Sequence, residues 1–523
     1  MNMSQRASYF GLGIFLVAML VLLLAGQSST APTEPREQRI FAMVKNMRAS
    51  GDYLVPRIKN EPHVNKPPFY VWLATGCNVG EILPTSVANR LPSILAALAT
   101  MAGLFFFCHA AGVPHLALPS AILLAACRTY ISEARIANFD ILLAAFCFAA
   151  NAFFWFYIHE RRTSQFLLAG AAFTLAFFTK ATPVFAMALV PWLILCWMEK
   201  KRVKQEFPEQ PYKTPVLPIA SIVIIGTAVG LAWFAAIWCM VPDGKKIIVE
   251  AATLPFGGTK NPNFIVRFLL QYIPTDALDG APKEKFALHY KSFYYFVEHF
   301  FMIIIPAALF LPLLIGRIWR TRGYQNMPLL RWMGVSFLAV LVIFSLIKQK
   351  QEAYMLPILP FVCILLADAL MAFLDGVREK IVPVCQWEWG WMNFLGYASA
   401  VLCFCAIVPF AFYFHAVVPH LLLLIVYPLL FTIFGIWIFL LTKRGDFTRM
   451  LLASVAWCWL SLIAYNGSIH VWMSLIDTNQ YQQETTLSPK YWEKVFKKYP
   501  FLKKSFRYPP EGVKEVPSEA GEE

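Results

Sequence analysis

Apolar stretches near the length of a membrane-spanning helix alternate with short polar segments along almost the whole chain. A helix needs about 20 predominantly apolar residues to cross a bilayer. The pattern therefore predicts an all-α polytopic membrane protein with about thirteen transmembrane helices. The predicted spans are 8–26, 88–108, 115–128, 139–158, 165–179, 183–198, 217–240, 296–315, 330–347, 354–374, 393–414, 419–442 and 450–466.

The lysines and arginines of the short loops indicate how these spans are oriented. With the N-terminus in the cytoplasm, the short inside loops carry sixteen Lys or Arg residues and the short outside loops carry five. Cytoplasmic loops are the more basic ones in membrane proteins, so the assignment agrees with the alternation of the spans. The apolar stretch from Tyr9 to Gly26 is longer than the core of a signal peptide, which favours a retained first span over a cleaved signal.

This orientation also divides the chain into regions. Residues 1–466 form one transmembrane region, with 27–87 and 241–295 as its long external loops. Residues 467–523 form a small C-terminal segment outside the membrane, and we expect its end to be disordered.

Composition supports the membrane assignment and excludes other classes. The chain has 523 residues, of which 58% are hydrophobic and 15% are charged, whereas about 25% of a soluble domain is charged. The net charge of +14 lies largely in loops that flank apolar segments, so it does not indicate nucleic-acid binding. The eleven cysteines show no zinc-binding spacing and lie mostly inside apolar stretches, where cysteine acts as a small apolar residue.

The first external loop carries two groups of charged residues. An amphipathic helix is predicted over 27–50, from Ile40, Met43, Val44 and Met47 at helical spacing. Its start contains Glu34, Arg36, Glu37 and Arg39, where a carboxylate suits a general base and arginines suit a phosphate. The alternative is a solvated, salt-paired helix start. Further along, prolines flank Arg57 and Lys66, which suit an anionic headgroup or contact lipid phosphates nonspecifically.

Other charged residues recur at the outside ends of spans. Asp140 begins an apolar stretch, where a carboxylate is unfavourable unless it is paired or functional, and Arg135 is its predicted partner. Lys180 lies alone in a tight turn, and Lys350 and Tyr354 precede a span that contains proline. There is no P-loop, GxSxG or HExxH motif. The pattern indicates a site at one membrane face, rich in cations and carboxylates, that suits a lipid-linked phosphate as leaving group.

The same residues carry a resemblance. GDYLVPRIKNEPHVNKPPFYVWL, from Gly51 to Leu73, resembles the GDWLVPRLNGEPYLEKPPLYYWL pattern of bacterial dolichyl-phosphate-mannose-type glycosyltransferases. That GT-C group includes the 4-amino-4-deoxy-L-arabinose transferase of lipid A. RLPSILAAL, EARIANFDILLAAF, FTKATPV, HYKSFYY and KQEAYMLPILP add to the match, which covers about residues 1–370.

The resemblance implies inverting transfer of a sugar from a polyprenyl phosphate on the periplasmic side of a bacterial inner membrane, with a divalent metal as the one candidate cofactor. It implies that Lys66 and Arg39 hold the donor phosphate and that Asp140 is an acidic site residue. His289 matches a position that helps to bind a divalent metal in the arabinose transferase. Lys350 and Tyr354 match a signature at the pocket rim.

Two departures from the family pattern leave the catalytic base open. The catalytic Asp of the family falls on Arg36 and the following Glu falls on Glu37, while the acid before KPP, a metal ligand in the arabinose transferase, is Asn65. The base is therefore Glu34 or Glu37, and a metal requirement stays open. An inactive copy or another acceptor is a further alternative.

The leading hypothesis is a glycosyltransferase that moves a sugar to lipid A, another glycan or a protein. The rivals are a transporter or flippase for lipid-linked sugars and a noncatalytic binder of them. The predicted catalytic residues are Glu34, Glu37 and Asp140; the predicted phosphate contacts are Arg39, Arg57, Lys66, Lys180 and Lys350; the predicted pocket residues are Arg36, Asn65, Arg135 and Tyr354, with His289 at a metal.

Overall fold

The structure is a computed structural model that describes residues 3–28, 32, 34–58, 61–64, 66–209, 212–253, 291–347, 350–378, 386–405 and 421–457. These residues are almost wholly helical. The sheet found among them pairs two short antiparallel strands, β1 (Arg57–Ile58) and β2 (Glu61–Pro62), with Arg57 opposite Pro62. The predicted C-terminal segment 467–523 and most of the predicted loop 241–295 lie outside the described residues.

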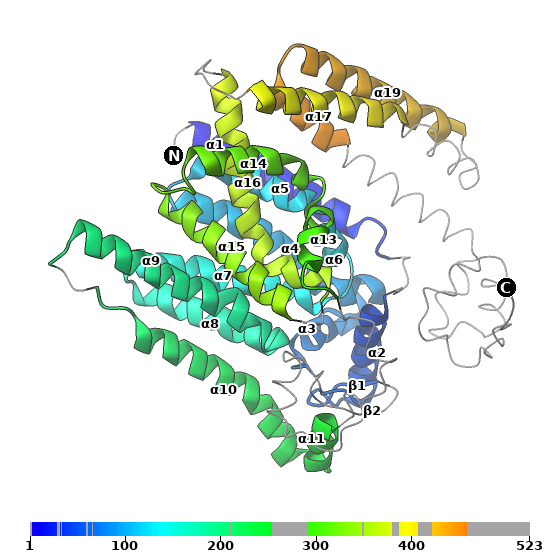
Figure 1. Cartoon of the computed structure of the whole chain (residues 1–523). Helices are drawn as coiled ribbons and strands as arrows, with labels where there is room; N and C mark the ends of the chain where they lie inside the picture. Colours follow the sequence, from blue (N-terminus) through cyan, green and yellow to red (C-terminus); the bar gives the residue numbers. More distant parts are fainter. Residues whose placement is uncertain are drawn as a thin grey trace, which may run out of the picture.

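The helices follow one another along the chain as Figure 1 shows. In the N-terminal half they are α1 (Met3–Leu24), α2 (Pro35–Ser50), α3 (Phe69–Cys77), α4 (Thr85–Ala110), α5 (Ala117–Ala126), α6 (Arg128–Ala134), α7 (Phe139–Glu160), α8 (Thr163–Lys180), α9 (Val190–Glu206), α10 (Val216–Met240) and α11 (Gly244–Thr253). In the C-terminal half they are α13 (Tyr295–Ile304), α14 (Leu311–Arg320), α15 (Pro328–Leu346), α16 (Leu359–Arg378), α17 (Gln386–Cys405) and α19 (Leu421–Lys443). The short helical turns are η1 (Val79–Glu81), η2 (Pro114–Leu116), η3 (Phe185–Leu189), η6 (Ala307–Phe310) and η7 (Glu352–Ile358).

The predicted polytopic, all-α architecture is confirmed. Among the described residues, six helices are long and apolar enough to cross a membrane, and a seventh span results if the bent pair Tyr295–Ile304 and Ala307–Arg320 is counted as one. Shorter apolar helices, such as Pro114–Ala126 and Phe447–Trp457, occupy other predicted spans. The count of thirteen stays a prediction.

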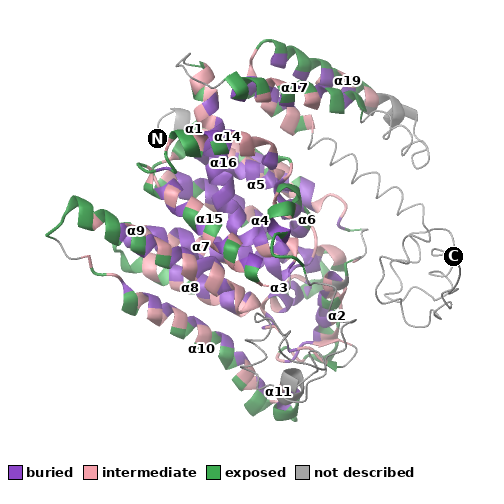
Figure 2. Cartoon of the chain, viewed as in Figure 1, coloured by how far each residue is buried: buried purple, intermediate pink, exposed green. Residues whose placement is uncertain are grey.

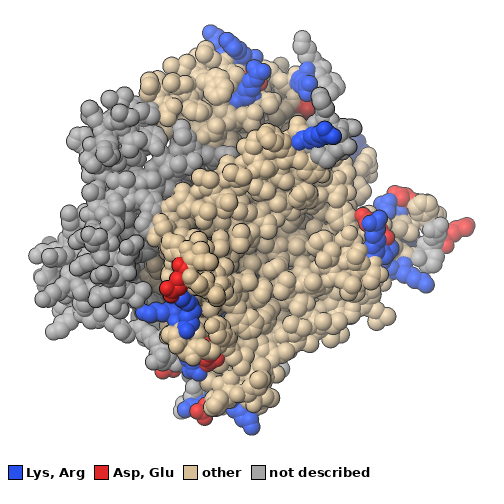
Figure 3. All heavy atoms as spheres, turned by 180° about the vertical axis from the view of Figure 1, so that it is seen from behind, with Lys and Arg blue, Asp and Glu red and all other residues tan. Residues whose placement is uncertain are grey.

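Helices differ in how far they are enclosed by their neighbours (Figure 2). In the span that contains η7 and α16, 89% of the apolar stretch is buried inside the protein, whereas 28% of the apolar stretch of α10 is buried. The view from behind shows a broad surface almost without charge, with Lys, Arg, Asp and Glu at its edges (Figure 3). This distribution suits a belt of side chains that faces lipid, with charged groups at both membrane surfaces.

The predicted amphipathic helix of the first external loop is α2, which begins at Pro35. Its apolar positions Ile40, Met43, Val44 and Met47 are buried in a cluster that includes residues of α3. At its end, Gly51 adopts a left-handed conformation and its N–H donates to the carbonyl of Met47 at 3.0 Å. This conformation favours glycine because it has no Cβ. α2 packs against α3, and the same cluster includes Phe139 and Leu142 at the start of α7.

Candidate functional site

Asp140 lies in the first turn of α7 and joins three helices. The side chain of Asn138 caps α7, because its Oδ1 accepts from the backbone N–H of Asp140 at 3.0 Å. Lys180, the last residue of α8, donates from Nζ to the carboxylate of Asp140. From α2, the Nη1 atom of Arg36 lies 3.9 Å from Oδ2 of Asp140. The buried carboxylate is therefore flanked by two cations that are distant from it in the sequence.

This arrangement corrects the predicted partner of Asp140. Arg135 donates instead to the backbone carbonyls of Leu22 and Ala25 at the end of α1, the latter at 2.6 Å. Helix ends leave carbonyl groups without partners inside the helix, and a guanidinium can satisfy several of them. Arg135 thus fixes the end of α1 next to the site.

A second buried carboxylate, Glu133 of α6, was not selected from the sequence. It accepts from Nη2 of Arg36 at 3.1 Å and from the amide of Asn138. Burial raises the pKa of Glu133, while the neighbouring charge of Arg36 acts in the opposite direction. The signal was present in the segment SEARIANFD, where an acid lies on a short helix between two apolar stretches.

The two glutamates proposed as base occupy different surroundings. Glu37 is fully buried, and its oxygens accept from Nε and Nη2 of Arg90 at 2.7 and 3.1 Å and from the N–H of Ala137 at 2.9 Å. This network joins α2, α4 and the segment before α7, so Glu37 holds the site together. Glu34 is exposed immediately before α2, beside Arg36 and Glu133. The exposed carboxylate is the better placed of the two to meet an acceptor.

Lys66 lies among other cations. Its ammonium is 5.0 Å from the centre of the Phe139 ring, and no ion pair to it is found among the described residues. Burial lowers the pKa of Lys66 to about 7, and the charges of Lys180, Arg39 and Arg36 act in the same direction, against that of Asp140. Burial and the charges of Arg39 and Lys66 also lower the pKa of His63 to about 4, so this imidazole is neutral near pH 7.

The remaining predicted site residues differ in whether they contact the group around Asp140. Lys180 places its Nζ 4.7 Å from the centre of the Tyr354 ring, which brings η7 to the site. Lys350 is 3% exposed and donates to the carbonyl of Lys291 at 3.1 Å. Arg57 forms an ion pair with Asp52 at 3.6 Å. Asn65 and His289 lie outside the described residues.

The described side chains do not fit a metal ion. No group of three or more His, Cys, Asp and Glu residues gathers around a common point within the described ranges. At the site itself, Arg36 and Lys180 already occupy the approaches to Glu133 and Asp140. A divalent cation requires several oxygen ligands directed at it, and these oxygens are directed at nitrogen donors.

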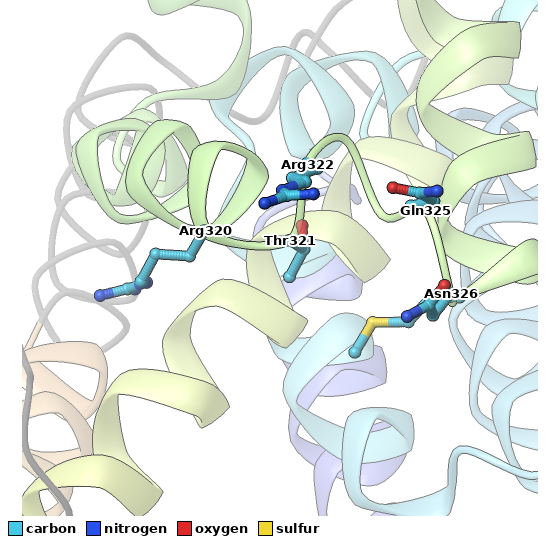
Figure 4. Close-up of a pocket in the computed structure, with 6 residues that line it drawn as sticks. Arg320, Thr321, Arg322, Gln325 and Asn326 are labelled. Carbon is cyan, nitrogen blue, oxygen red and sulfur yellow. The ribbon is translucent and has the colours of Figure 1, made fainter.

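A cavity of about 330 Å³ lies elsewhere, in the connection between α14 and α15. It is lined by Arg320, Thr321, Arg322, Gln325, Asn326 and Met327, and in Figure 4 the side chain of Arg320 points away from Gln325 and Asn326. Arg320 pairs with Glu388 at 2.7 Å. None of the lining residues belongs to the group around Asp140, so the cavity is separate from that group.

Part of the chain matches the model of a known protein family, and a longer part is similar to named proteins. The model of the dolichyl-phosphate-mannose-protein mannosyltransferase family matches residues 65–233. The undecaprenyl phosphate-alpha-4-amino-4-deoxy-L-arabinose arabinosyl transferase of Edwardsiella ictaluri is 24% identical over 396 residues, which cover 73% of this chain and 62% of that protein. The transferase of the same name from Pseudomonas savastanoi pv. phaseolicola is 23% identical and covers 70% and 62%. The chain thus spans about 62% of the length of these relatives.

Two solved structures share the fold. ArnT from Cupriavidus metallidurans superimposes with a TM-score of 0.62 in the apo state and 0.61 in the form bound to undecaprenyl phosphate. The sequence identities are 18% and 17%, and both matches cover 92% of this chain and 81% of the other. Together, the family region, the relatives and the fold confirm the predicted resemblance to GT-C glycosyltransferases.

Proposed function

We propose that this chain, a multi-pass GT-C protein of the mannosyltransferase and arabinosyl transferase type, transfers a sugar from a polyprenyl phosphate to an acceptor. Transfer takes place at the membrane face where Asp140 and Lys66 lie. In a bacterial inner membrane with the predicted orientation, this face is periplasmic. The acceptor is a lipid, a glycan or a protein that reaches this face.

The observation that carries the proposal is the group of cations around Lys66. Lys180, Arg39 and Arg36 lie close enough to Lys66 for their charges to lower the pKa of Lys66. Such a group is unfavourable in the empty protein and becomes favourable when an anion enters it. A donor phosphate supplies that anion, and fixed cations stabilise the charge that builds on its oxygens as the sugar leaves.

The carboxylates supply the other half of the reaction. The bond between the anomeric carbon and the phosphate oxygen breaks, and a bond forms between that carbon and the acceptor oxygen. Glu34 accepts the proton of an acceptor hydroxyl, because it is the exposed carboxylate of the group. The ion pair with Asp140 holds the ammonium of Lys180 in place at the phosphate. Attack opposite the leaving phosphate inverts the configuration of the sugar.

The test is transfer from a radiolabelled undecaprenyl-phosphate sugar by purified protein in lipid vesicles. We expect Glu34→Gln and Lys66→Ala each to reduce kcat/KM by about 100-fold or more, the usual effect of losing a base or an electrostatic contact. Glu61→Gln is the matched control, because Glu61 is an exposed acid of the same external loop. Full turnover in both site variants would contradict the assignment, and donor movement across the vesicle without transfer would indicate a flippase.

A further inference from the structure

Arg36 occupies the centre of the carboxylate group. Its guanidinium reaches Glu133 through Nη2 at 3.1 Å and faces Asp140 through Nη1 at 3.9 Å. The carboxylates belong to α6 and α7, and Arg36 belongs to α2. One side chain therefore bridges two buried acids from separate helices.

Two buried carboxylates that contact the same guanidinium repel each other unless a cation lies between them. In many sites that cation is a divalent metal held by several oxygens. Here the guanidinium takes the position between the two acids, and Lys180 and Asn138 occupy further oxygens of the same pair. A metal ion at this position would have to displace a charged side chain that is covalently part of the protein.

Arg36 also keeps one hydrogen-bonding group available. Its Nη1 atom is buried, and no acceptor lies within hydrogen-bonding distance of it among the described residues. A buried donor without an acceptor is unfavourable, and a bound substrate oxygen would satisfy it. The position thus combines a fixed positive charge with a free donor, which are the two properties that a metal ion supplies to a substrate oxygen.

We propose that Arg36 is the built-in cation of this site, holding Glu133 and Asp140 together in place of a metal ion and offering Nη1 to a substrate oxygen. The inference concerns the site to which the proposed function assigns transfer, but it makes a statement about cation binding that requires no turnover. It names a positioning role for a residue at which the family pattern has an acid.

The experiment measures Mn²⁺ binding by electron paramagnetic resonance in the purified full-length protein. We expect no tight Mn²⁺ site at these carboxylates in the wild type and an unchanged melting temperature after chelator treatment. Arg36→Asp removes the cation and adds an acid, so we expect it to bind Mn²⁺ at least about tenfold more tightly than the wild type. Adding Glu133→Gln to that variant should remove the gain, which assigns the ion to this group.

Two further variants keep the test decisive. Arg36→Gln removes the charge without adding an acid, and it should bind Mn²⁺ more weakly than Arg36→Asp but more tightly than the wild type. It replaces Arg36→Asp as the test if that variant fails to fold. Arg48→Asp is the matched control, because Arg48 lies on the same helix and pairs with the exposed Glu81. A wild-type Mn²⁺ signal that Glu133→Gln removes would overturn the proposal, as would variants of Arg36 that gain no Mn²⁺ while remaining folded.

Discussion

At the scale of single residues, the lowered pKa of Lys66 is the property that an activity measurement can test most directly. Its pKa of about 7 means that the amine loses its proton within the range in which enzymes are assayed. The charged form is the one that attracts a phosphate, and it predominates below pH 7. Raising the pH therefore removes the cation on which donor binding depends.

We predict that the KM for the polyprenyl-phosphate donor rises about fivefold between pH 7 and pH 8, as expected for loss of one proton from a group with this pKa. Initial rates at varied donor concentration across this range measure it. Lys66→Arg is the control, because a guanidinium stays charged and should give a flat profile. An equally steep rise in that variant would place the titrating group elsewhere.

The residues of the site could be predicted in part from the sequence. Asp140 and Lys180 stood out because charges are unfavourable at the ends of apolar stretches, and the structure pairs them. Arg135 is nearer to Asp140 in the sequence, but the turn capped by Asn138 separates them and the end of α1 offers Arg135 carbonyl acceptors. Glu133 also accepts from Asn138 in its own segment, but its contact with Arg36 of α2 spans 97 positions, and no local pattern reveals it.

At the scale of helices, close packing of α8 against α10 depends on two glycines. A Cβ at Gly226 would lie 2.9 Å from Cδ1 of Phe173, and a Cβ at Gly230 would meet the ring of Phe177 at a still shorter distance. Small residues four positions apart let membrane helices approach closely. The sequence GTAVG, from Gly226 to Gly230, therefore holds α10 on the outside of the bundle.

We predict that the double change Gly226→Ala and Gly230→Ala destabilises the protein by about 1–3 kcal/mol, the usual cost of inserting atoms into a packed contact. Thermal unfolding in detergent, followed by tryptophan fluorescence, measures the effect. Gly13→Ala is the control, since nothing lies within 4 Å of a Cβ at that position in α1. If both proteins unfold at the same temperature, the two glycines do not determine this packing.

The apolar pattern predicts where helices lie in the sequence better than it predicts where a helix bends. The predicted span 296–315 is divided in the structure between α13 and the segment Ala307–Arg320, which meet at 104°. Apolar composition continues through the bend, so a pattern of hydrophobicity alone joins the two pieces. Pro306 was the available signal, because proline removes a backbone donor and commonly ends a helix.

At the scale of the whole molecule, ionic groups occupy two separate levels. One level is the group around Asp140. The other contains Arg317 paired with Asp368 at 2.8 Å and Arg320 paired with the buried Glu388 at 2.7 Å, where α14, α16 and α17 meet. The face seen in Figure 3 is largely without charge, with Lys, Arg, Asp and Glu at its edges. The second level adjoins the loops rich in Arg and Lys, which are predicted to be cytoplasmic. The proposed chemistry therefore requires the first level to lie on the opposite side of the membrane.

Cysteine labelling of intact spheroplasts tests this orientation. In a background without the eleven native cysteines, we expect Glu61→Cys to react with an impermeant thiol reagent before lysis and Arg322→Cys to react only afterwards. Both positions are exposed, so access to solvent does not distinguish them and only the side of the membrane does. Reaction of Arg322→Cys in intact spheroplasts, with Glu61→Cys protected until lysis, would invert the topology. The site would then open to the cytoplasm, and a periplasmic acceptor could not reach it.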